Sequence, residues 1–464
     1  PTRSMFKICG KGRMSARIEV CALLIAATFA ASAALSQPQP QNSADQRALQ
    51  SLDNAYRSVV ATDADPTAAD KSLKLIHRVI DRIARSFIEP LSVGELANYS
   101  SSAIRRYPAG TQAKDLADAA IHEMVVRLGD PYATFDERRM PRKGKRISGI
   151  GIEATILNGR LKVIAPLEGS PAQKSGVEPG DIIVEIDREK IDGLTLKEAM
   201  DRIHGPIGTE VLLRIQRKGA RKLGLLVPRA RFRVREVRHA MFGDIAYIRV
   251  AFFGPDTEKL LRKALGAIKK EMGGAKPSGY IIDIRNNPGG LVGQAILLAD
   301  AFLEQGMIVA TTGRHAKGSR RYDAYRGDFV NGSPILILQN EASASAAEIL
   351  AAALKDNRRA TIMGTRSYGK GIVQTKFPIG AQGQIKFTTH KFMTAAGIQI
   401  HKIGVLPDIV VNGDPRPTYG AAATSIDRCP TAGKARDRML GCAILFVNKG
   451  RSIDSFLQAL PKLN

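Results

Sequence analysis

The feature that most constrains the fold is a regular alternation of strand-like and helix-like segments that begins at Ile245. The short apolar segments read IAYIRV, GYIIDIR, PILILQN and ATIMG, and the longer amphipathic segments include TEKLLRKALGAIKKEM, GQAILLADAFL and SASAAEILAAALKD. Short strands that alternate with helices are typical of a layered α/β core. We therefore predict such a core for this part of the chain.

Two regions with other periodicities precede this core. From residue 48 to about 121, apolar residues recur at spacings of three and four. This pattern predicts helices in LKLIHRVIDRIARSFIEP, which ends at Pro90, and in LADAAIHEMVVRL at 116–128. After a basic linker, PRKGKR at 141–146, short strands alternate with glycine-rich turns around one helix, LKEAMDRI. We predict a small β domain here, and helices in the tail segments GCAILFVNKG and SIDSFLQALPKL.

The first 36 residues have the pattern of an export signal. Basic residues, among them Lys7, Lys11, Arg13 and Arg17, precede the apolar run VCALLIAATFAASAAL, and small residues follow it. A membrane anchor is the alternative, but 16 residues are short for a transmembrane span. No later segment is apolar enough to cross a membrane, so we expect a soluble mature protein.

Charge and composition restrict the function classes. The formal net charge is +25, but Lys and Arg are spread along the chain and no helix-turn-helix or zinc-finger pattern occurs. A solvated basic surface is therefore favoured over specific nucleic-acid binding. No Trp is present and only 5% of residues are aromatic, which argues against carbohydrate or single-strand stacking platforms.

The cysteines and histidines bear on metal binding and on the redox compartment. No C-x-x-C occurs and there are only seven histidines, so no metal cofactor is expected. Cys429 and Cys442 remain after removal of the signal. In an oxidising compartment they could form a disulfide, and two buried free thiols are equally compatible with the sequence.

The segment GTRSYGKG at 364–371 nearly matches a nucleotide-binding loop. Gly364, Gly369 and Lys370 fit the pattern, but Gly371 stands where the pattern needs a Ser or Thr hydroxyl for Mg²⁺. The segment that follows, IVQTKFPIG, does not begin like a helix. We therefore reject the nucleotide interpretation and look for another role of Lys370.

Ser345 lies where an apolar strand turns into a helix, in LILQNEASASAAEILAAALKD. Helix amides at such a turn favour developing negative charge, although a plain N-capping role is the common alternative. No histidine lies in these turns, and the G-x-S-x-G and S-x-x-K patterns are absent. A lysine can serve as the base when burial lowers the pKa of its amine. Lys370, between two glycines and beside apolar residues, is the candidate.

These segments resemble the carboxyl-terminal processing peptidases, which are PDZ-containing serine proteases with a Ser-Lys dyad. The family stretch Ser-Ala-Ser-Ala-Ser-Glu-Ile reads SASAAEI here, at 343–349, with Ala347 in place of its last serine. The resemblance implies Ser345 as the nucleophile, Lys370 as the general base and Gln374 as the residue that orients Lys370. Residues i and i+4 of a strand face the same side, so we expect Gln374 to reach the Lys370 amine.

The resemblance also implies an oxyanion hole. DIRNNPGG at 283–290 matches a second family signature, whose glycine amide acts together with the amide after the nucleophile. The implied residues are Gly289 or Gly290, with Ala346. The NNPGG segment taken alone is equally compatible with a plain turn.

The small β domain resembles a PDZ module, with GSPAQKSGVEPGDIIVEID as the most specific part of the match. The amides of Gly149, Ile150 and Gly151 would hold a peptide C-terminus, and the peptide would add as a strand to the sheet edge. The family commonly has Ile-Arg-Gly where this chain has His204 in the middle position. This change either weakens the coupling of peptide binding to activation, or makes it pH-sensitive, or is harmless.

The resemblance extends from about residue 75 to 411 and implies a domain order. We expect a signal peptide at 1–36, a linker and helical region at 37–145, a PDZ domain at 146–232, a protease core at 233–413 and an extension at 414–464. The implied fold class is α/β, a layered core of the crotonase/ClpP type with an inserted PDZ domain and an N-terminal helical region.

The implied function is an exported serine endopeptidase of the periplasm or cell envelope, soluble or loosely membrane-associated. Its PDZ domain would capture protein substrates with free, unstructured, apolar C-termini, without metal or nucleotide cofactor. An adaptor or regulatory protein and a homo-oligomer stay open as partners. The rival hypotheses are an inactive PDZ scaffold that delivers partners to another protease, and a crotonase-like acyl-transfer enzyme.

Overall fold

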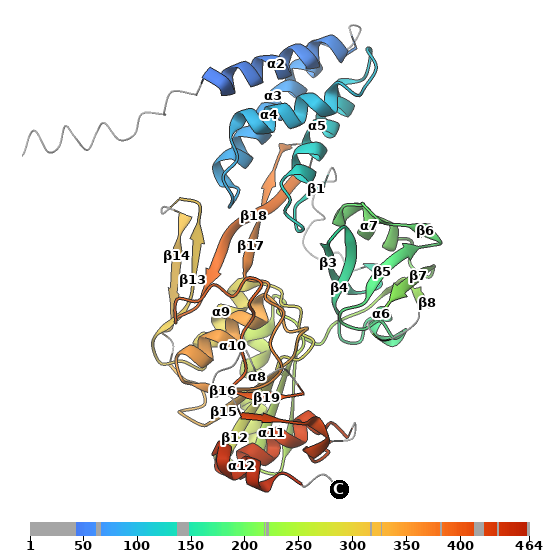
Figure 1. Cartoon of the computed structure of the whole chain (residues 1–464). Helices are drawn as coiled ribbons and strands as arrows, with labels where there is room; N and C mark the ends of the chain where they lie inside the picture. Colours follow the sequence, from blue (N-terminus) through green and yellow to red (C-terminus); the bar gives the residue numbers. More distant parts are fainter. Residues whose placement is uncertain are drawn as a thin grey trace, which may run out of the picture.

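The computed structural model describes residues 43–61, 66–136, 148–217, 219, 222–315, 318–325, 327–380, 383–412, 422–433 and 436–461. Figure 1 shows a helical region at one end, a β domain to one side, an α/β core in the middle and a helical C-terminal extension at the other end. The predicted signal segment at 1–36 and the basic linker at 141–146 lie outside the described residues.

Four helices build the N-terminal region: α2 (Ser43–Val59), α3 (Pro66–Ser86), α4 (Val93–Ile104) and α5 (Ala113–Arg127). Their apolar faces, spaced as the sequence predicts, share one core that includes Leu52, Ile76 and Ile121. A capping box between Ser92 and Glu95 begins α4. α3 ends at Ser86, so the predicted stop at Pro90 lies four residues too far along the chain.

A second sheet joins this helical region to the core, and the sequence analysis did not predict it. Its strands are β1 (Thr134–Asp136), β13 (Met307–Gly313), β14 (Arg320–Asp323), β17 (Ile372–Pro378) and β18 (Gln384–Met393). They follow the order β1-β18-β13-β14, and β17 pairs with β18. The β17–β18 hairpin reaches up to the helices in Figure 1, where Phe377 and Phe387 stack at 4.8 Å and Phe87 meets Phe387 edge-on.

Within the described residues, the β domain contains a six-stranded open sheet, a two-stranded sheet formed by β2 and β9, and two short helices. Its elements are β2 (Ser148–Gly149), β3 (Ile152–Leu157), β4 (Arg160–Pro166), α6 (Pro171–Lys174), β5 (Ile182–Ile186), β6 (Glu189–Lys190), α7 (Leu196–Ile203), β7 (Glu210–Gln216), β8 (Leu223–Pro228) and β9 (Ala230–Arg231). The main order is β3-β4-β5-β7-β8, so β3 lies at the sheet edge. The predicted helix LKEAMDRI is α7, capped by Thr195 and Glu198.

A seven-stranded sheet forms the predicted α/β core, in the order β10-β11-β12-β15-β16-β19-β20. The strands are β10 (Val237–Phe242), β11 (Ile245–Val250), β12 (Gly279–Asp283), β15 (Ile335–Gln339), β16 (Ala360–Gly364), β19 (Ile409–Val411) and β20 (Ala422–Thr424). β10 is antiparallel to β11, and the other neighbours are parallel. The carboxyl ends of β12 and β15 therefore meet at one edge, where DIRNNPGG and the Ser345 turn begin.

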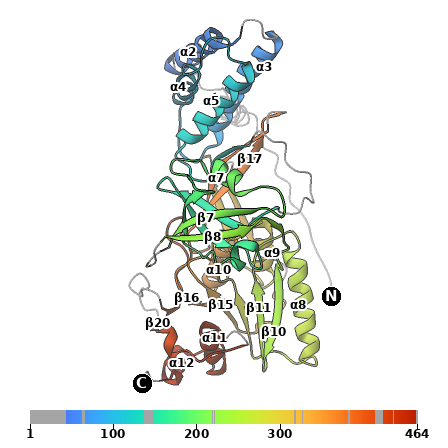
Figure 2. The same ribbon diagram turned by 90° about the vertical axis from the view of Figure 1, so that its right-hand side faces the viewer.

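Helices cover both faces of this sheet. The first face carries α8 (Thr257–Glu271), α9 (Val292–Asp300) and α10 (Ala346–Asp356), and Figure 2 shows α8 alongside β10 and β11. The C-terminal extension covers the second face with α11 (Arg438–Asn448) and α12 (Ile453–Ala459), after the 3-10 helix η4 (Ile426–Arg428). Neighbouring residues of β12 alternate between the two cores, with Ile282 in the first and Ile281 in the second.

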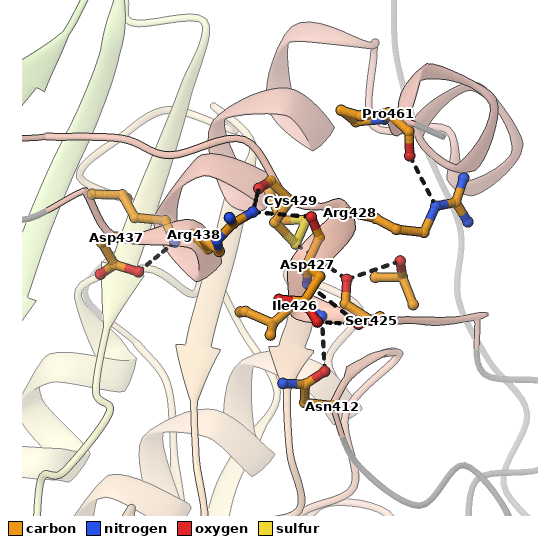
Figure 3. Close-up of a disulfide and its surroundings, with 12 residues drawn as sticks. Asn412, Ser425, Ile426, Asp427, Arg428, Cys429, Asp437, Arg438 and Pro461 are labelled. Carbon is orange, nitrogen blue, oxygen red and sulfur yellow. Dashed lines mark hydrogen bonds between the residues drawn. A yellow bond between two sulfur atoms is a disulfide. The ribbon is translucent and has the colours of Figure 1, made fainter. Parts of the chain in front are cut away.

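The two remaining cysteines form a disulfide, which decides between the alternatives left open by the sequence. Cys429 and Cys442 are bonded at the start of the C-terminal extension (Figure 3). Across the ranges described above, no helix is both long enough and apolar enough to span a membrane.

Candidate active site

Ser345 occupies a strained turn between β15 and α10. Its φ of 56° and ψ of −115° are rarely adopted by a residue with a side chain. The residue is half-buried, and α10 begins directly after it at Ala346. This geometry presents the hydroxyl-bearing residue at the N-terminus of a helix, where the dipole favours negative charge.

Glu348 fixes this turn, and the sequence analysis assigned it no role. Its fully buried carboxylate accepts hydrogen bonds from Ser345 N (2.8 Å), Ser367 Oγ (2.5 Å), Gly369 N (2.6 Å) and Lys370 N (2.8 Å). Burial raises the pKa of Glu348, while the hydrogen bonds from these four donors oppose the rise. One carboxylate thus joins the serine turn to the lysine turn.

A signal for this role was present in the sequence. Ser345 and Glu348 have the spacing of a helix capping box, S-x-x-E. The pattern predicts the bond from Ser345 N to the glutamate, but it contains nothing about Gly369 or Lys370.

The DIRNNPGG loop packs directly against Ser345. A Cβ atom at Gly289 would lie 2.8 Å from Ser345 Cβ and 3.0 Å from Ala346 N, so only glycine fits this approach. Gly289 N donates to Asn287 Oδ1 at 2.8 Å. Among the described residues, the amides of Gly290 and Ala346 have no hydrogen-bond partner. Of the two glycines named from the sequence, Gly290 therefore has the available donor.

Lys370 is buried, with 8% of its surface exposed, on the turn between Gly369 and Gly371. Its Nζ donates to Glu153 Oε1 of β3 at 3.2 Å and lies 4.6 Å from the ring centroid of Tyr132. The base candidate thus contacts the β domain and the segment after α5. Within the described part of the chain, no hydrogen bond joins Lys370 Nζ to Ser345.

Among the described residues, no hydrogen bond joins Gln374 to the Lys370 amine, and the argument from strand alternation does not hold at this position. β17 begins only at Ile372, after Lys370, and its register with β18 shifts between Val373 and Gln374. The alternation argument therefore does not apply across this turn. Gln374 Nε2 is buried, and it has no partner among the described residues.

A second lysine lies near the Lys370–Glu153 pair. Burial lowers the pKa of Lys386 on β18; the Glu153 charge opposes this effect, and the Lys370 charge adds to it.

The GTRSYGKG segment lies between β16 and β17, so a strand follows it instead of the helix that nucleotide binding requires.

The Gly149–Gly151 loop precedes the edge strand β3. The amides of Ile150 and Gly151 have no hydrogen-bond partner in the described ranges. His204, which ends α7, lies against this loop: a Cβ at Gly149 would come within 2.9 Å of its Cδ2 atom. An edge strand next to two available amides is the arrangement that a peptide C-terminus needs.

A cavity of about 1050 Å³ lies where the helical region, the β domain and the core meet. Apolar and aromatic side chains from all three line it, including Val125, Tyr132, Leu194 and Tyr368, and it reaches Gly369. The cavity thus leads from the β domain to the lysine turn.

Comparison with known proteins gives concordant matches. Residues 244–411 match peptidase family S41, and residues 162–217 match a PDZ domain. A carboxy-terminal-processing protease of Bartonella bacilliformis is 43% identical over 303 residues, which cover 64% of this chain and 69% of that protein. The carboxy-terminal processing protease CtpA of Bacillus subtilis is 34% identical over 309 residues, 65% of each protein. Among solved structures, the photosystem II D1 C-terminal processing protease has a TM-score of 0.65 at 26% identity, over 73% of this chain and 92% of that chain.

The fold and these matches define a serine-type peptidase of family S41 with an inserted PDZ domain and an N-terminal helical region. Within that family, the chain belongs to the carboxy-terminal processing proteases. The predicted family, enzyme class and fold class are confirmed, and the substrates are proteins. The domain boundaries and the roles of the individual site residues stay predictions.

Proposed function

We propose that this peptidase is exported, captures unstructured protein C-termini with its PDZ domain and cleaves the captured chains with a Ser345–Lys370 dyad. The observation that carries the proposal is the Glu348 carboxylate, which holds the backbone of both residues in one rigid unit. A catalytic serine and its base need such fixed relative positions.

In the proposed reaction, Ser345 Oγ attacks the scissile carbonyl and Lys370 accepts the serine proton. The new C–O bond forms as the carbonyl π electrons move to oxygen, and the amides of Gly290 and Ala346 stabilise that oxyanion. Lys370 then returns the proton to the leaving amine, and water hydrolyses the acyl-enzyme by the same route. Gln374 of β17 is the candidate for orienting Lys370, with its side-chain oxygen accepting a hydrogen bond from the lysine amine.

Lys370 must leave Glu153 before this chemistry begins. Its Nζ donates to Glu153 Oε1 at 3.2 Å and to no atom of Ser345 among the described residues, whereas a general base must be within hydrogen-bond reach of the proton that it accepts. Because Glu153 lies on β3, a peptide that adds along this strand is placed to disturb the pair. Peptide capture and release of the base would then be one event.

Capture by the PDZ domain is supported by the loop at 149–151. Two available amides can hold a terminal carboxylate, and β3 offers an unpaired edge. The apolar walls of the adjoining cavity favour apolar residues in the bound tail.

Export is supported by the N-terminal sequence pattern and by the disulfide. Structural disulfides such as Cys429–Cys442 are typical of proteins outside the reducing cytosol. We place the protein in the periplasm or cell envelope. An adaptor protein and self-association are further expectations from the family resemblance.

The test is cleavage of a fluorogenic, unstructured peptide with a free apolar C-terminus. We expect turnover by the chain without residues 1–36, and none by Ser345→Ala or Lys370→Ala. Lys376→Ala is the matched control, since Lys376 is an exposed lysine on β17, and this variant should retain activity. Peptide binding without turnover in any preparation would support the inactive PDZ scaffold instead.

A further inference from the structure

We propose that Asp437 of the C-terminal extension is a positioning residue for the oxyanion side of the active site, acting through Arg285. The inference rests on the proposed function, because it assigns a role in the same reaction. The extension lies beyond the residues that match peptidase family S41.

The Arg285 guanidinium is held between two carboxylates. Its Nη2 lies 2.6 Å from Asp283 Oδ2 and 2.6 Å from Asp437 Oδ2, and its Nη1 lies 3.1 Å from Asp437 Oδ1. Only 19% of the Arg285 side chain is exposed. A planar guanidinium fixed along two edges by charged acceptors has little freedom to rotate.

Arg285 lies at the base of the proposed oxyanion loop. The next residue, Asn286, has a φ of 55°, and its side-chain amide and backbone exchange hydrogen bonds with Asn340 of the serine loop. Asn287, fully buried, then accepts from Ala344 N at 2.9 Å. A displacement of Arg285 would therefore also displace Gly290 and Ser345, because a short, hydrogen-bonded segment connects these residues.

The carboxylate of Asp437 is itself held in place by the extension. Asp437 caps α11 by accepting from Leu440 N at 3.0 Å, and its backbone exchanges hydrogen bonds with Ala432. The neighbouring Arg438 donates to the Cys429 carbonyl, as Figure 3 shows. Asp437 thus lies inside the loop closed by the disulfide, which presents its carboxylate to Arg285.

Asp283 alone would hold Arg285 less firmly. Asp283 also pairs with Arg249 at 3.6 Å and accepts from the Tyr247 hydroxyl at 2.8 Å, so its oxygens are shared. Burial raises the pKa of Asp283, but the charges of Arg285 and Arg249 outweigh it and hold the value at about 2. Two carboxylates therefore hold Arg285: that of Asp283, which also contacts Arg249 and Tyr247, and that of Asp437 from the extension.

The main test compares Asp437→Asn with wild type and with Asp454→Asn. Asn and Asp cap helices about equally well, so the substitution retains the cap and removes the charge. Asp454, exposed in the first turn of α12, undergoes the same chemical change away from Arg285. Asp437→Ser, another capping residue, replaces Asp437→Asn if that variant fails to fold.

The readouts are kcat, KM, the affinity of a peptide boronic acid and the rate at which a fluorophosphonate labels Ser345. We expect Asp437→Asn to lower kcat and the labelling rate about ten-fold with little change in KM, because a misplaced oxyanion donor weakens only the transition state. Boronate affinity should fall by the same factor. Asp454→Asn should behave as wild type.

Wild-type kcat, labelling rate and boronate affinity in Asp437→Asn would overturn the proposal. The proposal would also be overturned if the losses of kcat, labelling rate and boronate affinity only equalled the fraction of unfolded protein, since Asp437 would then have a purely structural role. Ser345→Ala is assayed in parallel: turnover by that variant contradicts the proposed dyad itself. Loss of turnover in Ser345→Ala together with a wild-type Asp437→Asn contradicts the role of Asp437 alone.

Discussion

The two members of the proposed dyad are held in different ways. Ser345 and its turn are fixed from within the core, by Glu348 and by the bonded loop at 283–290. The Lys370 backbone shares the Glu348 carboxylate, but its amine is held by Glu153 of the PDZ domain and by Tyr132, which follows α5. The proposed nucleophile is thus preorganised by one domain, whereas the position of the proposed base depends on how three regions meet.

From this difference we expect the core to keep the site rigid and the PDZ domain to regulate it. Fixed geometry favours catalysis by oxyanion donors and by the strained serine turn, because such groups stabilise a transition state best when they are already in position. The Lys370 amine contacts Glu153 of the β domain, so under the proposed mechanism it would respond to peptide binding there without any change in that geometry. Substitutions in the core should therefore destroy the site, and substitutions in the PDZ domain should tune it.

The largest effect is expected from Glu348→Ala. The change leaves four donors near the site without their acceptor, and each unsatisfied buried group costs about 1–3 kcal/mol. We expect loss of turnover and a free energy of unfolding lower by more than about 3 kcal/mol, measured by urea denaturation. Glu348→Gln retains the shape and should lose less; equal stability of the alanine variant and wild type would contradict the role of Glu348.

The next effect concerns the extension. Replacing Cys429 and Cys442 with serine opens a short loop, which lowers the free energy of unfolding by about 3 kcal/mol. The folded fraction of this double variant should still cleave peptide, with kcat lowered by at most about ten-fold as in Asp437→Asn, because the disulfide touches neither Ser345 nor Lys370 and can act on the site only through Asp437. Complete inactivity of correctly folded variant protein would contradict this indirect role of the disulfide.

The acid sensitivity of the core should depend on Asp283. Its pKa of about 2 lies below the usual value of 3.8, so its ionised form contributes stability that is present above about pH 4 and lost as the pH falls through 2. The difference between these two pKa values corresponds to a free energy of about 2 kcal/mol. Urea denaturation should show that Asp283→Asn has a lower free energy of unfolding than wild type at pH 7 and nearly the same value at pH 2. An equal difference between variant and wild type at both pH values would contradict this role of Asp283.

The smallest effect is expected from Glu153→Gln. Loss of the carboxylate removes the hydrogen-bonded ion pair that holds the Lys370 amine against β3, which frees the amine to reach Ser345, so kcat/KM at neutral pH should rise about three-fold. Glu89→Gln is the matched control, since Glu89 pairs with Lys391 at 2.9 Å and not with the proposed base. Equal changes in both variants would show that the Glu153 pair has no special role.

The parts of this account that the sequence could predict are those encoded locally. Helix α7 has the predicted bounds, because its capping box and apolar spacing lie within a few residues. The alternation after Ile245 predicted the core because each strand and helix buries a periodic set of side chains. Ser345 and Lys370 were selected by short motifs in the same way.

The parts that were missed depend on contacts between distant segments. Thr134 pairs with Lys386 across the whole PDZ insertion, and Glu153 meets Lys370 between domains. Periodicity reports which side of an element is buried but not what covers it. The register shift at Gln374 shows the same limit, because alternation along a strand does not foresee a bulge.

The most direct test of the central claim is chemical rescue of Lys370→Ala. In the proposed reaction the Lys370 amine accepts the proton of Ser345, and Lys370→Ala removes that amine. Added methylamine should therefore restore part of the peptide cleavage, in proportion to the neutral amine present. The same amine should not restore Ser345→Ala. Near-wild-type cleavage by Lys370→Ala without any added amine would contradict the dyad.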